Sequence, residues 1–128
     1  MKILGIGVDI IKNKRIKILI KDSMFVNRIY TSKELAQSSL IKNKISFFSK
    51  RFAAKEAFAK ALGTGFRNNL NFKDIEIIND KMGKPYYSKT KKIKKVVQKN
   101  FKVKNFDCFL SISDEKDYST AFTIIQSI

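Results

Sequence analysis

The 128-residue sequence contains no histidine and a single cysteine, Cys108. Without histidine the chain cannot form a Ser-His-Asp or Cys-His catalytic site, nor a histidine-ligated zinc site. One cysteine cannot form a disulfide within the chain. The sequence also lacks any run of about 18 apolar residues, and its start, MKILGIGVDI, lacks a small-residue cleavage site. We therefore expect a soluble, cytoplasmic protein that does not enter a membrane.

Acidic residues are scarce, with 11 Asp and Glu against 27 Lys and Arg, which gives a net charge of +16. This excess points to a polyanionic partner: nucleic acid, an acidic protein, an anionic membrane surface or a phosphate-rich small molecule. Lysine supplies 23 of the basic residues, and Ile and Asn are also abundant. Because an A+T-rich genome imposes this combination on any protein, we attribute part of the charge to composition.

The chain is the size of one globular domain, residues 1–128, and is organised around residues 51–65, RFAAKEAFAKALGTG. This stretch predicts a helix, because no proline or β-branched residue interrupts residues 47–62 and alanine and leucine favour helix. Gly63 and Gly65 supply the backbone freedom used at a helix C-terminus. The predicted buried arc consists of Ala53, Ala54, Ala57, Phe58, Ala61 and Leu62.

Glu56 and Lys60 fall together at the edge of this arc, four residues apart. Considered alone, this pair is better explained as an ordinary i,i+4 ion pair, worth a few tenths of a kcal/mol.

The first predicted strand, residues 2–10, adds a second carboxylate. Gly5 and Gly7 lead to Asp9 on one face, which predicts an open surface for close approach that ends in a carboxylate. Asp9 is either a capping residue at the strand end or part of a site with Glu56. The other, apolar face consists of Leu4, Ile6, Val8 and Ile10.

The remaining patterns predict further helices and two hairpins. Asn13 is a predicted helix cap, the helix after it is continuous or broken near Asp22-Ser23, and Thr31 and Glu34 form a capping box. The basic side of the first helix is either a solvated face or a docking surface for an acidic partner. The predicted helices are residues 13–30, 32–41 and 90–104, and the predicted strands are residues 73–79, 85–88, 106–113 and 118–126.

Asp9 and Glu56 are two hard oxygen ligands that could converge on one cation. Mg²⁺ is held by one or two carboxylates together with water and substrate phosphates, so two carboxylates suffice. Lys60 and the loop Gly63-Thr-Gly65 add an ammonium and backbone N–H groups that suit a phosphate. Together these parts predict chemistry at a pyrophosphate.

The chain resembles the holo-[acyl-carrier-protein] synthases, the small bacterial form of 4′-phosphopantetheinyl transferase, over essentially its whole length. The resemblance is carried by linked motifs in matching order and spacing: Gly5-Ile-Gly-Val-Asp-Ile10, Arg15-Ile16, Arg51-Phe-Ala-Ala-Lys-Glu-Ala57, Lys60, Gly63-Thr-Gly65 and Gly83-Lys-Pro85. It implies an α+β fold, with helices packed on a small, mostly antiparallel sheet. It also implies a trimer with each active site at a subunit interface.

By this resemblance, the enzyme transfers the 4′-phosphopantetheine arm of coenzyme A to a serine of apo acyl carrier protein, with Mg²⁺, and releases adenosine 3′,5′-bisphosphate. The reaction supports fatty acid biosynthesis. Asp9 and Glu56 match the metal ligands, and Lys60 matches a lysine that contacts the transferred phosphate. Either Glu56 or a metal-bound water takes the serine proton.

The resemblance also assigns two binding surfaces. The coenzyme A-binding residues are Arg51, Lys55, Lys60, Gly63, Thr64, Gly65, Lys84 and Pro85. The carrier-protein surface consists of Lys14, Arg15, Lys21 and Arg28. Phe109 departs from the family, since many relatives have a histidine there, near the adenosine end of coenzyme A. We predict that lysines of residues 91–104 or Lys84 supply the missing charge.

A small basic nucleic-acid-binding module is the main alternative. The net charge and the seven lysines between Lys91 and Lys104 favour it. The absence of an RNA-recognition signature or zinc-finger spacing, and the core periodicity of the phenylalanines, argue against it. A carrier-protein-binding protein without catalysis is a third interpretation, and the intact Asp9, Glu56 and Lys60 argue against that one.

Overall fold

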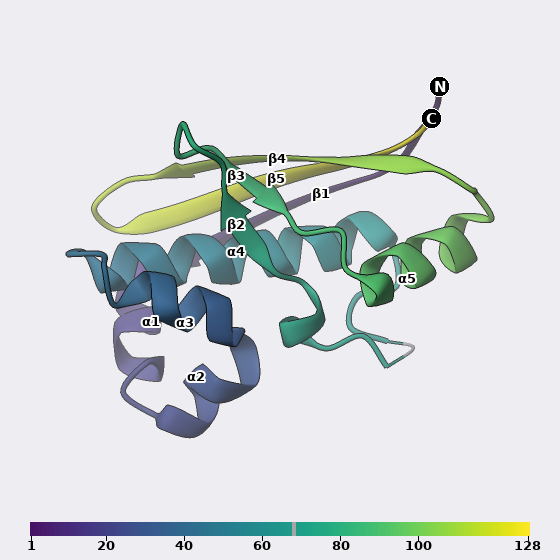
Figure 1. Ribbon diagram of the computed structural model, residues 1–128. Helices are drawn as coiled ribbons and strands as arrows, with labels where there is room; N and C mark the ends of the chain where they lie inside the picture. Colours follow the sequence, from purple (N-terminus) through teal and green to yellow (C-terminus); the bar gives the residue numbers. More distant parts are fainter. Residues whose placement is uncertain (68) are drawn as a thin grey trace.

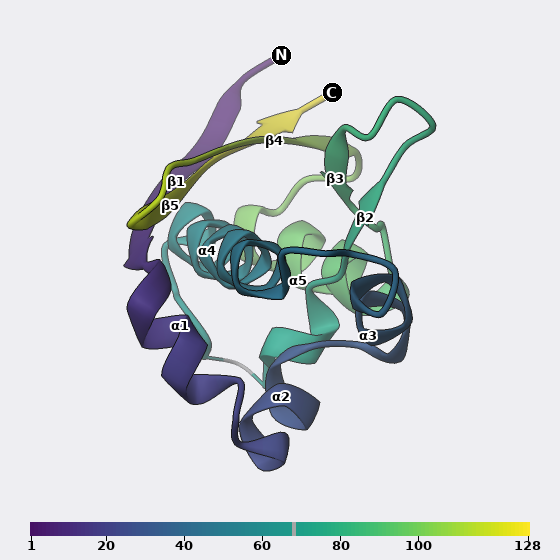
Figure 2. The same ribbon diagram turned by 90° about the vertical axis from the view of Figure 1, so that its left-hand side faces the viewer.

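An antiparallel sheet lies along one side of a long central helix, and the shorter helices lie on the other side (Figures 1 and 2). The computed structural model describes residues 1–67 and 69–128. The sheet has the strand order β1-β5-β4, and its strands are β1 (Ile3–Lys12), β4 (Phe106–Asp114) and β5 (Tyr118–Ser127). With its second, two-stranded antiparallel sheet, the chain has the predicted α+β architecture.

The central helix α4 spans Lys44–Leu62 and is enclosed on nearly all sides. Asn43 caps its start by accepting a hydrogen bond from the Ser46 N–H, and Gly63 ends it with a φ of 80°. All six residues of the predicted buried arc are buried. The prediction of a single arc was nevertheless too narrow, because Phe48 and Ala59 on the opposite side of the helix are buried as well.

The two faces of β1 are arranged differently from the prediction. A Cβ atom on Gly5 would lie 1.9 Å from the Ala61 carbonyl oxygen, and one on Gly7 would lie 1.9 Å from that of Ala57. The glycine face is therefore packed against α4 and is not open. The predicted apolar face is instead largely turned outward: Ile6, Val8 and Ile10 are 60, 56 and 65% exposed.

The predicted helix over residues 13–30 is two helices, α1 (Asn13–Leu19) and α2 (Ser23–Ile29), so of the two alternatives the broken helix is the one found. Asp22 caps α2 by accepting a hydrogen bond from the Met24 N–H. Asn13 is not a helix cap. Its side-chain amide donates to the carbonyls of Glu115 and Lys116 and so holds the turn between β4 and β5.

The capping box of Thr31 and Glu34 is confirmed and opens α3 (Ser32–Ser38), which ends before the predicted boundary. The region predicted as one strand from residue 73 begins with a 3₁₀ turn, η1 (Phe72–Asp74). The predicted hairpin follows it, and a basic helix, α5, precedes β4. The bounds are β2 (Ile77–Asn79), β3 (Pro85–Tyr87) and α5 (Lys91–Phe101). Among the described residues, no helix is long and apolar enough to cross a membrane.

Candidate active site

Two adjoining elements, β1 and α4, bring Asp9, Glu56 and Lys60 together. The Lys60 Nζ lies 3.0 Å from the Asp9 Oδ1 and 3.1 Å from the Val8 carbonyl oxygen. Burial raises the pKa of Glu56, and the charge of Asp9 raises it further, while Lys60 and Arg15 act in the opposite direction. These four side chains therefore form one electrostatic cluster at the surface of α4.

The glycines of β1 explain why Asp9 lies so near the helix. Since Gly5 and Gly7 have no side chains, the strand backbone contacts the backbone of α4 directly at Ala57 and Ala61. The Thr120 hydroxyl donates to the Asp9 carbonyl at 2.8 Å and fixes that point of β1 from the neighbouring strand. The position of the carboxylate is thus set by the rigid scaffold.

Asp9 and Glu56 fit a hard divalent cation. Two carboxylates close enough to disfavour each other's charge are stabilised by a cation between them, and carboxylate oxygens are the ligands that Mg²⁺ prefers. Among the described residues there is no cluster of three or more His, Cys, Asp or Glu side chains that could hold a metal. Any cation here would therefore need further ligands from water or a phosphate substrate.

The glycine loop after α4 is arranged differently from the prediction. The Gly63 N–H donates to the Lys60 carbonyl, and the Gly65 N–H donates to the Ala59 carbonyl at 3.2 Å. Both N–H groups therefore close the end of the helix and do not point toward a ligand. The loop places Thr64, which is half-buried, directly after the helix that carries Glu56 and Lys60.

Arg51 and Lys55 were predicted to contact coenzyme A, and the structure places both inside the protein. The Lys55 ammonium is fully buried and donates to Glu34, to the Ile29 carbonyl and to the Phe72 carbonyl. An ammonium has three protons, so none is left for a phosphate.

Arg51 is held in the same buried region. Its Nη2 donates to Gln37 and Asn79, and its guanidinium lies 3.8 Å from the centre of the Phe47 ring.

The sequence did contain a signal for the burial of Lys55. Lys55 has Phe52 three positions before it and Phe58 three positions after it, so its side of the helix is apolar.

The predicted carrier-protein residues are all exposed but fall into three places. Lys14 and Lys21 line a hollow of about 410 Å³ beside α1. Arg28 lines a larger cleft, and Arg15 belongs to the cluster around Glu56.

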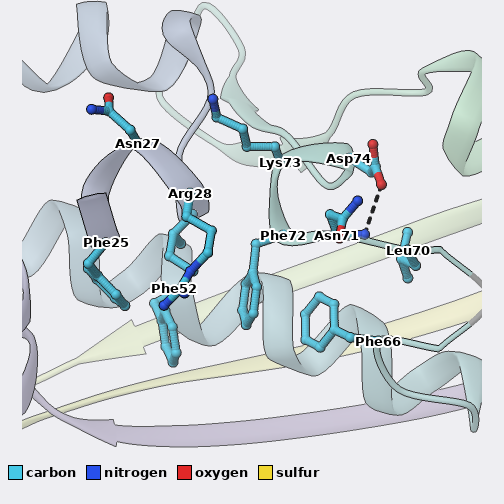
Figure 3. A pocket seen from close by; sticks show the side chains of 11 residues that line it. Phe25, Asn27, Arg28, Phe52, Phe66, Leu70, Asn71, Phe72, Lys73 and Asp74 are labelled. Atoms are coloured by element: carbon cyan, nitrogen blue, oxygen red, sulfur yellow. Dashed lines mark hydrogen bonds between the residues drawn. The ribbon is translucent and has the colours of Figure 1, made fainter. Parts of the chain in front are cut away.

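The larger cleft, of about 680 Å³, was not predicted (Figure 3). Its apolar lining is a row of phenylalanine rings: the Phe52 and Phe72 ring centres are 5.4 Å apart, and those of Phe66 and Phe72 are 4.0 Å apart. Arg28 and Lys73 add positive charge to the lining. Phe52 precedes Glu56 by four residues, so the cleft begins about one helical turn from the carboxylate.

Lys84 and Pro85 lie on the far side of the sheet from Asp9. β1 forms one edge of the sheet and β4 the other, and the hairpin that carries Lys84 lies beyond β4 (Figure 2). Within one chain, these two predicted coenzyme A contacts are therefore not beside Glu56 and Lys60.

Comparisons with known proteins agree with one another. The model of the 4′-phosphopantetheinyl transferase superfamily matches residues 5–123. A holo-[acyl-carrier-protein] synthase of Pelagibacter ubique (strain HTCC1062) is 61% identical over 126 residues, which is 98% of each chain. A crystal structure of such a synthase from Neisseria meningitidis is 38% identical and has a TM-score of 0.86, over 98% of this chain and 99% of that one. A structure from Bacillus anthracis str. Ames, in complex with CoA (3′,5′-ADP), is 34% identical with a TM-score of 0.82 over 100% of both chains.

Proposed function

The chain belongs to the 4′-phosphopantetheinyl transferase superfamily, and on that premise we propose that it transfers 4′-phosphopantetheine from coenzyme A to a serine of apo acyl carrier protein. The observation that carries the proposal is that Asp9, Glu56 and Lys60 lie close together where β1 contacts α4. The relatives with this chain's length and fold are synthases of this activity.

In this reaction the serine oxygen attacks the phosphorus that carries the pantetheine arm. The bond from this phosphorus to the bridging oxygen breaks, and adenosine 3′,5′-bisphosphate leaves with that oxygen. The serine proton must depart at the same time. Either Glu56 or a water molecule bound to the cation would accept this proton.

Asp9 and Glu56 would hold the Mg²⁺ ion. When bound, Mg²⁺ neutralises charge on the pyrophosphate and on the leaving group. Lys60, about half exposed, reaches the transferred phosphate from the same helix and adds a second positive charge there.

Carrier protein docks on α1 and α2 in this proposal. Lys14, Lys21 and Arg28 present positive charge that suits an acidic partner, and the phenylalanine cleft beside Arg28 offers an apolar contact. The cleft begins about one turn of α4 from Glu56, so a partner held there would bring its serine toward the carboxylates.

Coenzyme A binds between two copies of the chain. Lys84 and Pro85 lie beyond the edge of the sheet opposite Asp9, so a second copy would have to supply them to the same ligand. The outer face of the sheet suits such an assembly because it is apolar and exposed. Its exposed apolar residues are Ile6, Val8, Ile10, Phe109 and Phe122. We propose that this face is covered in a trimer.

Lysines of α5 supply the charge that a histidine provides in many relatives. The Asn100 side chain donates to the Leu62 carbonyl at 2.7 Å, which fixes α5 beside the glycine loop. A hollow of about 420 Å³ on this helix is lined by Lys92, Lys95 and Lys99. These lysines therefore suit the 3′-phosphate better than the alternative, Lys84.

The holo carrier protein would then serve fatty acid biosynthesis in the cytoplasm.

The test is the intact mass of apo acyl carrier protein after incubation with the protein, coenzyme A and Mg²⁺. We expect a gain of one phosphopantetheine group, which EDTA, Asp9→Ala and Glu56→Ala abolish and the control Glu115→Ala, in an exposed turn, preserves. No gain with several carrier proteins, together with a salt-sensitive shift of DNA or RNA, would favour the nucleic-acid interpretation. A gain that survives both site variants would contradict the metal site.

A further inference from the structure

Lys55 joins three elements through one buried ammonium. Its Nζ lies 2.7 Å from the Glu34 Oε1, 2.9 Å from the Ile29 carbonyl oxygen and 3.1 Å from the Phe72 carbonyl oxygen. Ile29 is the last residue of α2, Phe72 is the first residue of η1, and Glu34 belongs to α3. The ammonium thus connects segments that are distant in the sequence.

Two of these partners, Ile29 and Phe72, line the phenylalanine cleft, which is the cleft of about 680 Å³ with the row of rings. Its α2 wall includes Ile29 and Arg28, and its η1 wall includes Phe72 and Lys73. Figure 3 shows Arg28, Phe72 and Lys73 around the cleft. Phe52, one turn before Lys55 on α4, lies between them in the row of rings: its ring centre is 6.1 Å from that of Phe25 and 5.4 Å from that of Phe72. Lys55 therefore bonds to both walls from the helix that carries Phe52.

Glu34 holds the ammonium in place. Its Oε1 also accepts the Thr31 N–H at 2.9 Å, and its Oε2 accepts the Ile77 N–H at 3.1 Å. The carboxylate is thus fixed by two backbone groups, and the ammonium cannot shift without breaking a buried ion pair. Such buried pairs often add little to net stability compared with apolar packing, so a role in geometry is the better explanation for this one.

We propose that Lys55 is a positioning residue for carrier-protein recognition. It sets the separation of α2 and η1 and thereby fixes the position of their cleft relative to the adjacent Glu56. The inference rests on the proposed function, because it takes the cleft to be where the carrier protein docks. Without the ammonium, the Ile29 and Phe72 carbonyls lose their shared donor and the two walls separate. The two carboxylates stay in place, because β1 and α4 hold them through other contacts. The α5 lysines proposed for coenzyme A also stay in place, because Asn100 holds α5 to the Leu62 carbonyl.

Lys55→Met tests this inference, since methionine has a similar unbranched chain without charge or donors. The matched control is Lys50→Met, which removes a half-buried lysine from the same helix. We expect the KM for apo carrier protein to rise about tenfold, which corresponds to about 1.4 kcal/mol of lost binding free energy. The KM for coenzyme A should change by less than about twofold, and the control should change neither value.

A merely structural role would not produce this split. Partial unfolding lowers the concentration of active enzyme and hence kcat, and leaves both KM values unchanged. Calorimetric binding of apo carrier protein without coenzyme A should weaken by the same factor of about ten. If Lys55→Met does not fold, Lys55→Gln, whose side-chain amide keeps two donors without the charge, should show the same split at a smaller size.

Two results would overturn the inference: an unchanged KM for carrier protein in a folded variant, or an equal rise in both KM values. The wild-type protein separates this failure from failure of the proposed function. A wild type that transfers no phosphopantetheine refutes the function itself, whereas an active wild type without the split refutes only the role of Lys55.

Discussion

The two sides of α4 carry the same kinds of charged residue in opposite surroundings. On the side facing β1, Glu56 is partly buried, with a pKa raised by burial and by Asp9, and Lys60 is about half exposed. On the other side, Arg51 and Lys55 are buried and bonded to partners from other elements.

The difference separates structural from functional charge. The Lys55 ammonium has all its hydrogen bonds within the protein, so it can organise its neighbours but cannot bind a phosphate. The carboxylates of Asp9 and Glu56 repel each other in a partly open position, and Lys60 and Arg15 offset part of this repulsion. In the proposed function, a bound divalent cation would offset the rest.

The largest loss of stability should follow from removing an ion-pair partner of the buried charges on α4. Glu34→Ala leaves the Lys55 charge unpaired and removes the acceptor of two backbone N–H groups. We expect a loss of about 3–5 kcal/mol in the free energy of unfolding, measured by urea denaturation. The exposed Glu115→Ala is the control, and a loss similar to that of the control would show that the pair is not structurally important.

A smaller loss should follow from separating β1 from α4. Gly7→Ala introduces a Cβ that would lie 1.9 Å from the Ala57 carbonyl, so the strand must move outward. We expect a loss of about 1–3 kcal/mol, typical of overpacking, together with a large loss of transfer activity because Asp9 moves with the strand. Ala36→Gly, on the exposed side of α3, is the control. It should lose about 1 kcal/mol through helix propensity but keep the activity of its folded fraction. Activity retained in Gly7→Ala would contradict the account of how Asp9 is placed.

Glu56→Gln should act in the opposite direction and raise the melting temperature slightly. Because the folded-state pKa of Glu56 is raised, its favourable contribution is present at low pH and is lost as the pH rises through that pKa. The variant does not titrate, so its advantage over the metal-free wild type should be absent near pH 4 and present at pH 7. Mg²⁺ with coenzyme A should raise the melting temperature of the wild type more than that of the variant. A variant less stable than wild type at pH 7 would contradict the conclusion that burial and Asp9 destabilise the charged Glu56 carboxylate.

The smallest change should come from the exposed charges, which belong to neither side of α4. Lys21→Met should leave the melting temperature unchanged, because the residue is exposed on the surface. The KM for carrier protein should rise a few-fold at low salt, and this difference should disappear at high salt as charge is screened. Lys81→Met, in the exposed turn between β2 and β3, is the control. Equal effects of both variants would show only a general dependence on net charge.

The sequence alone determined features that depend on neighbouring residues. The capping box of Thr31 and Glu34, the glycine end of α4, the break near Asp22 and both hairpins are local signals, and each is found in the structure. The linked motifs predicted the family, and the family model over residues 5–123 and a relative of 61% identity confirm it. Asp9, Glu56 and Lys60 were grouped by their chemistry, since two hard oxygen ligands and an ammonium suit a cation and a phosphate.

Only the tertiary structure decided which surfaces are buried. The alternation in β1 cannot say which face meets a helix, and the backbone contact of Gly5 and Gly7 with α4 turned the apolar face outward. The phenylalanines around Lys55 indicate an apolar side of the helix, but only the fold supplies Glu34 and the two distant carbonyls that bind its ammonium, while Lys60 stays half exposed. Caps and turns are set by interactions between adjacent residues, whereas burial depends on surfaces that meet only after the whole chain has folded.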